Sequence, residues 1–221
     1  MERMLLLNWN ELIPGILLVA LLSYLLGSLS FAVIVSKLLE KDDVRDHGSG
    51  NAGMTNVLRT YGKGPAALTL LGDFSKGVVA VLLGRWIFQW MGITVLDAGQ
   101  VAGLFALLGH IFPLYFHFKG GKGVLTSAGM IAVINPVVLG MLVVIVVPVI
   151  FLTRIVSVGS LLAAVLYPLL TAVVLYVQNQ PVWGDTLFAA AFAVIVIFMH
   201  RENIVRLIHG TENRFGSKKK K

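Results

Sequence analysis

Long apolar segments alternate with short polar ones along the whole chain. The apolar runs are about 17 to 27 residues long, close to the roughly 20 that a transmembrane helix needs. They do not show the period-two alternation of a porin-type barrel. The pattern therefore predicts an all-α integral membrane protein in which residues 1–221 form a single polytopic domain.

We predict about seven membrane segments, separated by short stretches rich in glycine, proline or charge: Leu12–Leu39, Gly64–Trp90, Ala98–Phe116, Val124–Ile134, Val137–Leu152, Val158–Val177 and Asp185–Met199. The fourth segment has only about a dozen residues, so it also fits a half-helix inside the bundle. Merging it with the fifth and dropping one more gives an alternative with five crossings.

Charge then orients the chain. Hydrophobic residues make up 57% and charged residues 13%, with a mean hydropathy of +0.86 and a net charge of +7. With the N-terminus outside, the basic residues outside are Arg3 and Arg85, whereas the inside holds fifteen: Lys37, Lys41, Arg45, Arg59, Lys63, Lys119, Lys122, Arg154, Arg201, Arg206, Arg214 and Lys218–Lys221. The positive-inside rule thus predicts a cytoplasmic C-terminus in the inner membrane, and it accounts for the charge without nucleic acid.

The most polar stretch is Gly48–Arg59, GSGNAGMTNVLR, which the predicted topology places on the cytoplasmic face. It combines small residues with hydrogen-bond donors: Gly48, Ser49, Gly50, Asn51, Gly53, Thr55, Asn56 and Arg59. Glycines allow backbone N–H groups to approach a ligand, and the side chains add further donors. We expect this stretch to hold a phosphate-like anion.

A second cytoplasmic cluster, His117–Gly123, reads HFKGGKG. Lys119 and Lys122 stand among Gly120, Gly121 and Gly123, which suits an anion wrapped by N–H groups and two ammonium charges. The spacing is not that of a nucleotide-binding P-loop. An ordinary basic cytoplasmic loop with helix-breaking glycines is the alternative.

Further polar residues occur at the end of the last segment and inside two others. His200 and Asn203 become neighbours if the last helix continues, and Arg206 follows them. A polar helix end at the headgroups explains these residues equally. Asp73 and Lys76 have i, i+3 spacing within the second segment, which indicates a ligand contact by Lys76 or an internal ion pair.

His110, in the third segment, fits either a ligand contact or a buried hydrogen-bonded histidine. Other chemistry lacks its motif. No HExxH or comparable cluster indicates a metal, and no GxSxG elbow occurs. The HxxxxD motif of the common soluble-type glycerolipid acyltransferases and the aspartate motif of CDP-alcohol phosphotransferases are missing, and the sequence has no cysteine.

Four motifs together resemble one family. GSGNAGMTNVLR, LGDFSKG, GHIFPLYFHFKGGKGV and HRENIVRLIHGTEN, spread from about Leu25 to Asn213, are similar to those of the bacterial acyl-phosphate:glycerol-3-phosphate acyltransferases, the PlsY family. The resemblance implies transfer of an acyl group from acyl phosphate to the 1-hydroxyl of glycerol 3-phosphate. The products are lysophosphatidate and phosphate, and the reaction is the first acylation of phospholipid synthesis. It implies no cofactor, and its partners are the two substrates, membrane lipid and a peripheral enzyme that forms the acyl phosphate.

On this resemblance we assign catalytic roles to Ser49, Asn51, Asn56, Arg59, His200 and Asn203. Substrate-binding roles go to Gly48, Gly50, Thr55, Lys76, His110, Lys119, Gly120, Gly121, Lys122, Gly123 and Arg206. The stretch 48–59 is expected to cradle the acyl phosphate, and 119–123 with His200 and Asn203 to hold glycerol 3-phosphate. Direct transfer is preferred to a Ser49 acyl-enzyme because the sequence pairs no base with that serine.

The alternative class of protein is a transporter or channel for an organic phosphate. Seven helices, a half-helix and basic loops are compatible with it. The polar motifs, however, fall on one face, and no inverted repeat is visible.

Overall fold

The structure is a computed structural model that describes residues 9–215, and within that range it contains helices and no strand. It divides into two compact units, one ending at Ile134 and the other beginning at Asn135. The predicted all-α class is confirmed, and the prediction of one membrane domain stays a prediction. Arg3 and the run Lys218–Lys221 lie outside the described residues.

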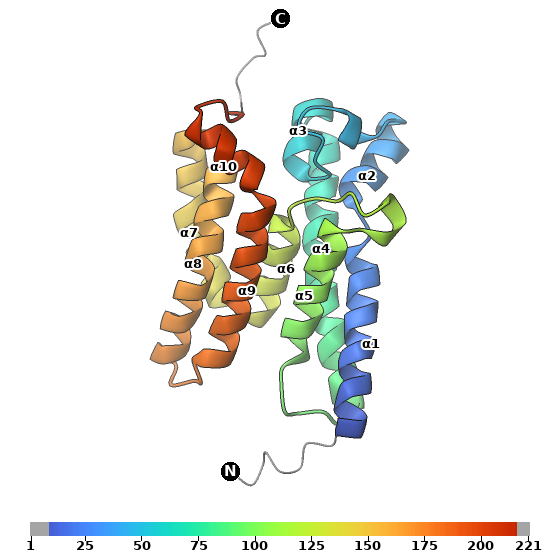
Figure 1. Ribbon diagram of the computed structural model, residues 1–221, viewed down its shortest axis with the longest axis vertical. Coiled ribbons are helices and arrows are strands. Elements are labelled where there is room, and N and C mark those ends of the chain that lie inside the picture. Colours follow the sequence, from blue (N-terminus) through green and yellow to red (C-terminus); the bar gives the residue numbers. More distant parts are fainter. Residues whose placement is uncertain (1–8, 216–221) are drawn as a thin grey trace, which may run out of the picture. The chain divides into compact units, whose positions relative to one another are not determined.

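The first unit holds four helices of 11 to 28 residues and several shorter elements. The four helices are α1 (Trp9–Gly27), α4 (Lys63–Trp90), α5 (Ala98–Ile111) and α6 (Val124–Ile134). The short elements are α2 (Phe31–Val35), the π-helical turn η2 (Ser36–Glu40), α3 (Met54–Tyr61) and the 3-10 turns η3 (Val44–Asp46) and η4 (Leu114–Phe116). In Figure 1, α1 starts at the end of this unit where the 91–97 connection lies, and α2 and α3 lie at the opposite end.

Glycines bring the helices of the first unit into backbone contact. α1 packs on α5, and α4 packs on α6. A Cβ added at Gly109 of α5 would meet Tyr24 O of α1, and one at Gly129 of α6 would meet Phe74 O of α4. Membrane helices associate by such close van der Waals packing because lipid supplies no hydrophobic force between them. Gly27 at the end of α1 likewise lies against the Ala106 backbone of α5.

The first apolar segment is not the continuous helix expected from its composition. α1 ends at Gly27, and the chain resumes as α2 at Phe31. A helix end inside a bundle leaves carbonyl groups without partners. The buried Lys76 of α4 is the partner of two such carbonyls, because its Nζ donates to Gly27 O at 2.9 Å and Leu29 O at 2.8 Å.

An apolar cluster anchors the polar residues 41–62 to the end of the bundle. Its buried members come from α2, η3, α3, α4 and the stretch between η3 and α3: Ala32, Val33, Val44, Ala52, Val57 and Ala66. Val44, Ala52 and Val57 are the buried apolar residues of the polar stretch, and they join it to this cluster. The stretch is therefore a packed cap with its own small core, and eight of its residues, Met54–Tyr61, form the helix α3.

The second unit consists of α7 (Pro136–Thr153), α8 (Val156–Val177), α9 (Trp183–Met199) and α10 (Arg201–Ile208). α8 packs between α7 and α9. Asn135 caps α7 by accepting a hydrogen bond from Val138 N at 3.2 Å, and Pro136 occupies the first turn, where its missing N–H costs nothing. α10 is bent by 59° from α9, so the last segment does not continue straight past His200.

All seven predicted segments contain a helix, but they differ in length. Within the described residues, five spans are long and apolar enough to cross a membrane, and α9 with α10 would make a sixth. α6 has eleven residues, so it rises only about 16 Å, roughly half of a hydrocarbon core. This length fits the half-helix considered from the sequence.

The close α4–α6 contact predicts an asymmetric response to added methyl groups. Gly129→Ala should lower the free energy of unfolding by about 1–3 kcal/mol because its Cβ would run into the Phe74 backbone. Gly140→Ala in α7, whose Cβ would meet nothing within 4 Å, should be neutral or stabilising. Thermal unfolding of both variants in one detergent measures the difference. Equal melting temperatures would contradict the packing.

Candidate active site

The Asn56 side chain is the centre of the polar cap of the first unit. Its Nδ2 donates to Val44 O and His47 O, both at 2.9 Å, and to Asn51 O at 3.2 Å. Its Oδ1 accepts from Ser49 N at 3.0 Å. With 2% of its surface exposed, this carboxamide has both N–H groups in use inside the protein. The geometry gives it a structural role in the loop, instead of the catalytic contact expected from the sequence.

Backbone N–H groups of the same loop are also paired within the protein. Gly50 N donates to His47 O at 2.9 Å, Gly53 N to Asn51 O at 3.0 Å, and Ala52 N to Gly120 O at 3.4 Å. Most of the N–H groups that were expected to point at an anion therefore donate to oxygen atoms of the protein itself. The glycines serve turns and close approach: Gly48 and Gly50 have φ of +59° and +69°, and a Cβ at Gly48 would meet Asn56 Oδ1.

Side chains remain for ligand contact. Ser49 and Arg59 are exposed, and Asn51 and Thr55 are half-buried. Arg59 lies in the last turn of α3, where a cation is favoured by the helix dipole. No carboxylate within residues 9–215 forms an ion pair with it. This guanidinium is thus available to an anion in water.

The second predicted cluster, His117–Gly123, lies in the loop 112–123, and the N–H groups of this loop are likewise bound within the protein. Gly120 N donates to Ile111 O at 3.2 Å and Gly121 N to His110 O at 3.1 Å. A Cβ at Gly120 would meet His110 O, and one at Gly121 would meet His110 Nε2 and lie 2.5 Å from Ala52 O. These glycines let the loop lie flat on the end of α5. The cations of this loop are Lys119, which is exposed, and Lys122, which is half-buried, and their predicted role in anion binding stays a prediction.

The turn that precedes Lys119 is locally unfavourable. His117 and Phe118 both have left-handed φ, of +57° and +58°. Such a conformation costs roughly 1–2 kcal/mol per non-glycine residue, so it persists only where the surroundings fix it. At the other end of the loop the left-handed position is Gly123, with φ of +84° and no such cost.

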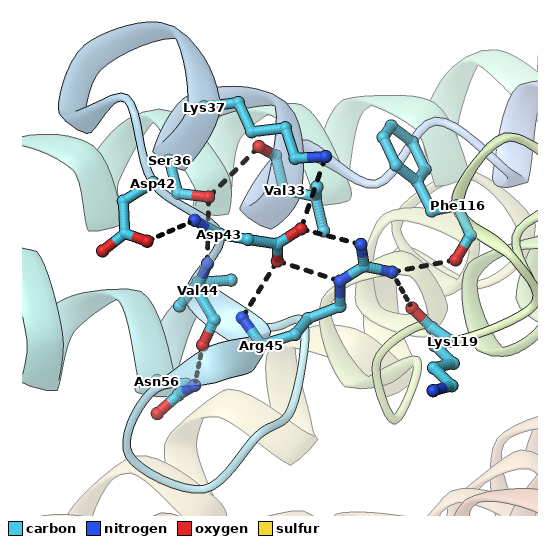
Figure 2. A network of polar contacts seen from close by, with 10 residues as sticks. All are labelled: Val33, Ser36, Lys37, Asp42, Asp43, Val44, Arg45, Asn56, Phe116 and Lys119. Atoms are coloured by element: carbon cyan, nitrogen blue, oxygen red, sulfur yellow. Dashed lines mark hydrogen bonds and ion pairs between the residues drawn. The ribbon is translucent and has the colours of Figure 1, made fainter.

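Arg45 connects the two loops, as Figure 2 shows. Its Nη1 donates to Phe116 O at 2.8 Å and Lys119 O at 3.3 Å. Its Nε and Nη2 donate to Asp43 Oδ1 at 2.9 Å and Oδ2 at 2.7 Å, a bidentate pair. The Arg45 guanidinium holds the pKa of the Asp43 carboxyl well below its usual range. Sequence reasoning counted Arg45 only as a basic cytoplasmic residue.

Asp73, Lys76 and His110 form a buried group beneath the second loop. Lys76 Nζ lies 3.0 Å from Asp73 Oδ1 and donates to His110 Nδ1 at 2.9 Å, besides the two carbonyls of the α1 end. An ammonium only donates, so His110 Nδ1 accepts and Nε2 carries the proton. With 2% and 3% of their surfaces exposed, Lys76 and His110 fit the internal ion pair and the buried histidine, not substrate binding.

In the second unit, Glu212 is hydrogen-bonded to polar residues of α8 and α10. Its carboxylate accepts hydrogen bonds from Asn203 Nδ2 at 2.7 Å, Arg206 Nε at 2.7 Å and Ser157 Oγ at 3.0 Å. Partial burial opposes its ionisation, but the donors outweigh this and lower the pKa of Glu212. The carboxylate holds Arg206, which was predicted to bind substrate. Glu212 therefore has a structural role beside α10.

His200 lies at the bend between α9 and α10 and is buried. Its Nδ1 lies 2.8 Å from Val196 O, so the proton of this ring is on Nδ1 and the bond fixes the ring orientation. Asn203 is one turn further along and also buried. The two predicted i, i+3 residues are thus both buried, His200 directly before α10 and Asn203 within its first turn. Within the residues that the structure describes, no group of three potential metal ligands occurs.

Comparison with known proteins agrees with the motifs. The family model described as glycerol-3-phosphate acyltransferase matches residues 17–210. A glycerol-3-phosphate acyltransferase of Clostridioides difficile (strain 630) is 41% identical over 203 residues, covering 92% of this chain and 97% of that protein. Another, from Neisseria meningitidis serogroup C, is 44% identical, covering 88% of this chain and 94% of the relative.

Solved structures agree as well. A crystal structure of PlsY (YgiH), described as an integral membrane glycerol 3-phosphate acyltransferase in its glycerol 3-phosphate form, superposes with a TM-score of 0.79. It is 35% identical, and the match covers 91% of this chain and 96% of that one. The lysophosphatidic acid form of PlsY gives a TM-score of 0.77. The chain therefore belongs to the PlsY family of integral membrane glycerol-3-phosphate acyltransferases, as the motifs predict.

Proposed function

We propose that this protein transfers a fatty acyl group from acyl phosphate to the 1-hydroxyl of glycerol 3-phosphate, releasing lysophosphatidate and inorganic phosphate. The family membership supports the acceptor and the reaction type. One similar structure is named for its glycerol 3-phosphate form and another for its lysophosphatidic acid form, which fits the proposed acceptor and product.

One observation carries the proposal. Two loops that are distant in sequence are joined by the Ala52–Gly120 hydrogen bond and by Arg45, and each carries an exposed cation, Arg59 or Lys119. Both substrates bear a phosphate group, so a site for them needs at least two positive charges held in register. The neighbouring hydroxyls and carboxamide, Ser49, Thr55 and Asn51, add donors for the phosphate oxygens and for the oxyanion of the transferred acyl group.

We assign the residues by loop. Arg59, Ser49, Thr55 and Asn51 bind the acyl phosphate, while Asn56 holds their loop in shape. Lys119 and Lys122 bind glycerol 3-phosphate through their side chains, and the glycines around them allow the loop to pack. A contribution of His200 and Asn203 to glycerol 3-phosphate binding stays a prediction.

Little activation of the nucleophile is needed, because an acyl phosphate is already activated and phosphate is a good leaving group. Holding the hydroxyl against the carbonyl carbon supplies much of the rate. We expect the proton of the hydroxyl to pass to a substrate phosphate, and the catalytic role assigned to His200 from the sequence stays a prediction. Among residues 9–215, no histidine or carboxylate is hydrogen-bonded to Ser49 Oγ, which supports direct transfer over an acyl-enzyme.

We also propose that the N-terminus lies outside and that this site faces the cytoplasm from the inner membrane. In the first unit, the two loops lie at the end opposite the start of α1 (Figure 1). That end carries most of the unit's basic residues, whereas Arg85 lies near the other end, paired with Asp97. The positive-inside rule favours the cytoplasm for the basic end. A peripheral enzyme that forms the acyl phosphate would deliver it from this side.

The reaction separates the proposal from the transporter alternative. Purified protein in detergent, without vesicles, should release phosphate from palmitoyl phosphate only when glycerol 3-phosphate is present. Phosphate release and lysophosphatidate formation, measured together, should be equimolar. A transporter would give neither product. Mass spectrometry after a rapid quench should show unmodified protein, and an acylated Ser49 would refute direct transfer.

Arg59 is expected to dominate the charge of the site. Arg59→Ala should lower kcat/KM by about 100-fold or more, because a charge-assisted contact to a phosphate oxygen is lost. Lys63→Ala is the matched control, since it removes an exposed cation four residues away at the start of α4. Its effect should stay within about twofold. Similar losses in both variants would indicate a general electrostatic effect instead of a phosphate contact.

Gly121 tests the packing of the second loop. In Gly121→Ala the new methyl group would meet His110 Nε2 and Ala52 O, so the loop must move. We expect KM for glycerol 3-phosphate to rise about tenfold with a smaller change in kcat, as for a lost ground-state contact. Gly64→Ala, at the first turn of α4 with nothing within 4 Å, is the control. Steady-state kinetics at varied glycerol 3-phosphate would contradict the assignment if the two variants behaved alike.

A further inference from the structure

The Arg45 side chain connects parts of the first unit that are about seventy residues apart in sequence. Three of its nitrogens donate to two different structures, the Asp43 carboxylate and the carbonyls of Phe116 and Lys119 (Figure 2). The Arg45 backbone N–H also donates to Asp43 Oδ1 at 3.1 Å. Both side chains of the pair are largely removed from solvent, with 17% and 16% exposed. Asp43 thereby fixes the plane of the guanidinium.

The two carbonyls that Arg45 holds flank the unfavourable turn of the second loop. Phe116 O comes before the left-handed residues His117 and Phe118, and Lys119 O follows them. A backbone in this region needs support from outside, because neither residue is glycine. The Nη1 group gives that support by binding both ends of the turn at once. It therefore fixes the orientation of the Lys119 backbone after the turn.

The position of Arg45 relative to the first loop is fixed from the other side. Val44, its neighbour, is buried in the apolar cluster, and its carbonyl accepts from Asn56 Nδ2. The Val44 N–H donates to Ser36 Oγ at 3.3 Å. Arg45 thus transmits the position of the Asn56-centred loop to the 116–119 turn through a short, hydrogen-bonded path.

We infer that Arg45, oriented by Asp43, is a positioning residue that sets Lys119 and the 120–123 glycine loop in register with the Gly48–Arg59 loop for binding of the phosphate-bearing acceptor. The inference rests on the proposed function for the identity of that acceptor, glycerol 3-phosphate. The geometric part, the support of the 116–119 turn, does not depend on any activity.

Lysine is a poor substitute at this position. It would keep the positive charge, but its single ammonium group lacks the planar fork that binds a carboxylate with two nitrogens while a third nitrogen holds the carbonyls. Arg45→Lys therefore separates the charge of the cap from its geometry. Arg45→Gln removes both, and Asp43→Asn leaves the guanidinium in place but weakens its orientation.

The first unit also contains a matched control. Arg85 donates to Asp97 through Nε at 3.0 Å and Nη2, at 2.6 Å, and its Nη1 donates to a backbone carbonyl, Val133 O, at 3.2 Å. This pair has the same bidentate form and the same third contact, but it ties α4 to the ends of α5 and α6. Loss of the Arg85 pair should affect folding alone.

The experiment compares Arg45→Lys, Arg45→Gln and Asp43→Asn with Arg85→Lys and Arg85→Gln in the full-length detergent-solubilised protein. Hydrogen exchange of the peptide covering residues 112–123 reports on the turn, and steady-state kinetics at varied glycerol 3-phosphate report on the acceptor site. For the Arg45 variants we expect exchange of this peptide to be about tenfold faster and KM for glycerol 3-phosphate to be about tenfold higher, with kcat changed less. For the Arg85 variants both quantities should match the wild type, even where the melting temperature falls.

Each failure has a separate meaning. If exchange of 112–123 is unchanged in all three Arg45 and Asp43 variants, the inference is overturned whether or not the protein is active. The same holds if the Arg85 variants raise KM equally. If the wild-type protein forms no lysophosphatidate while exchange responds as expected, the proposed function fails and the support of the turn stands. If exchange rises but KM for glycerol 3-phosphate does not, the positioning role is refuted.

Discussion

The hydrogen bonds of the Asn56 carboxamide hold the polar cap of the first unit in one conformation. They tie together three backbone carbonyls and one N–H that lie between Val44 and Asn51. A chain that leaves a membrane helix and returns to the next must satisfy its backbone polar groups near an apolar bundle, where an unpaired group is costly. One buried side chain meets much of this demand. The surrounding side chains, Ser49 and Arg59 among them, are left facing solvent.

The glycines of the two loops therefore have a structural role. In both loops their N–H groups are largely bound to carbonyls of the protein, and their missing side chains allow backbones to approach, as at Gly121 beside His110 and Ala52. The same use of glycine joins α4 to α6 and α1 to α5 inside the bundle. The two loops and the membrane helices thus both depend on close backbone contact, and the proposed phosphate contacts are left to arginine and lysine side chains.

Much of this could be predicted from composition and spacing, and the remainder depends on contacts between distant residues. The apolar runs located the helices, and the short run Val124–Ile134 was recognised as too short for an ordinary crossing. The break after Gly27 was missed because it depends on Lys76 of another helix, whose ammonium binds the free carbonyls of Gly27 and Leu29. Hydropathy along the chain contains no information on such a contact. Asn56 and Asn51 look equivalent in sequence, and only the fold shows which is buried. The sequence does not distinguish Arg45 from the other basic residues, because its role depends on contact with the distant 112–123 loop.

We propose that the two loops bind phosphate through side chains while their glycine N–H groups hold the fold together. An experimental structure of this protein with both phosphate groups bound would distinguish these two roles. We expect phosphate oxygens within hydrogen-bond distance of the Arg59 guanidinium and the Lys119 or Lys122 ammonium, with Gly120 N and Gly121 N still bonded to Ile111 O and His110 O. Phosphate oxygens bound instead to the N–H groups of Gly120 and Gly121, with those two backbone bonds broken, would contradict it.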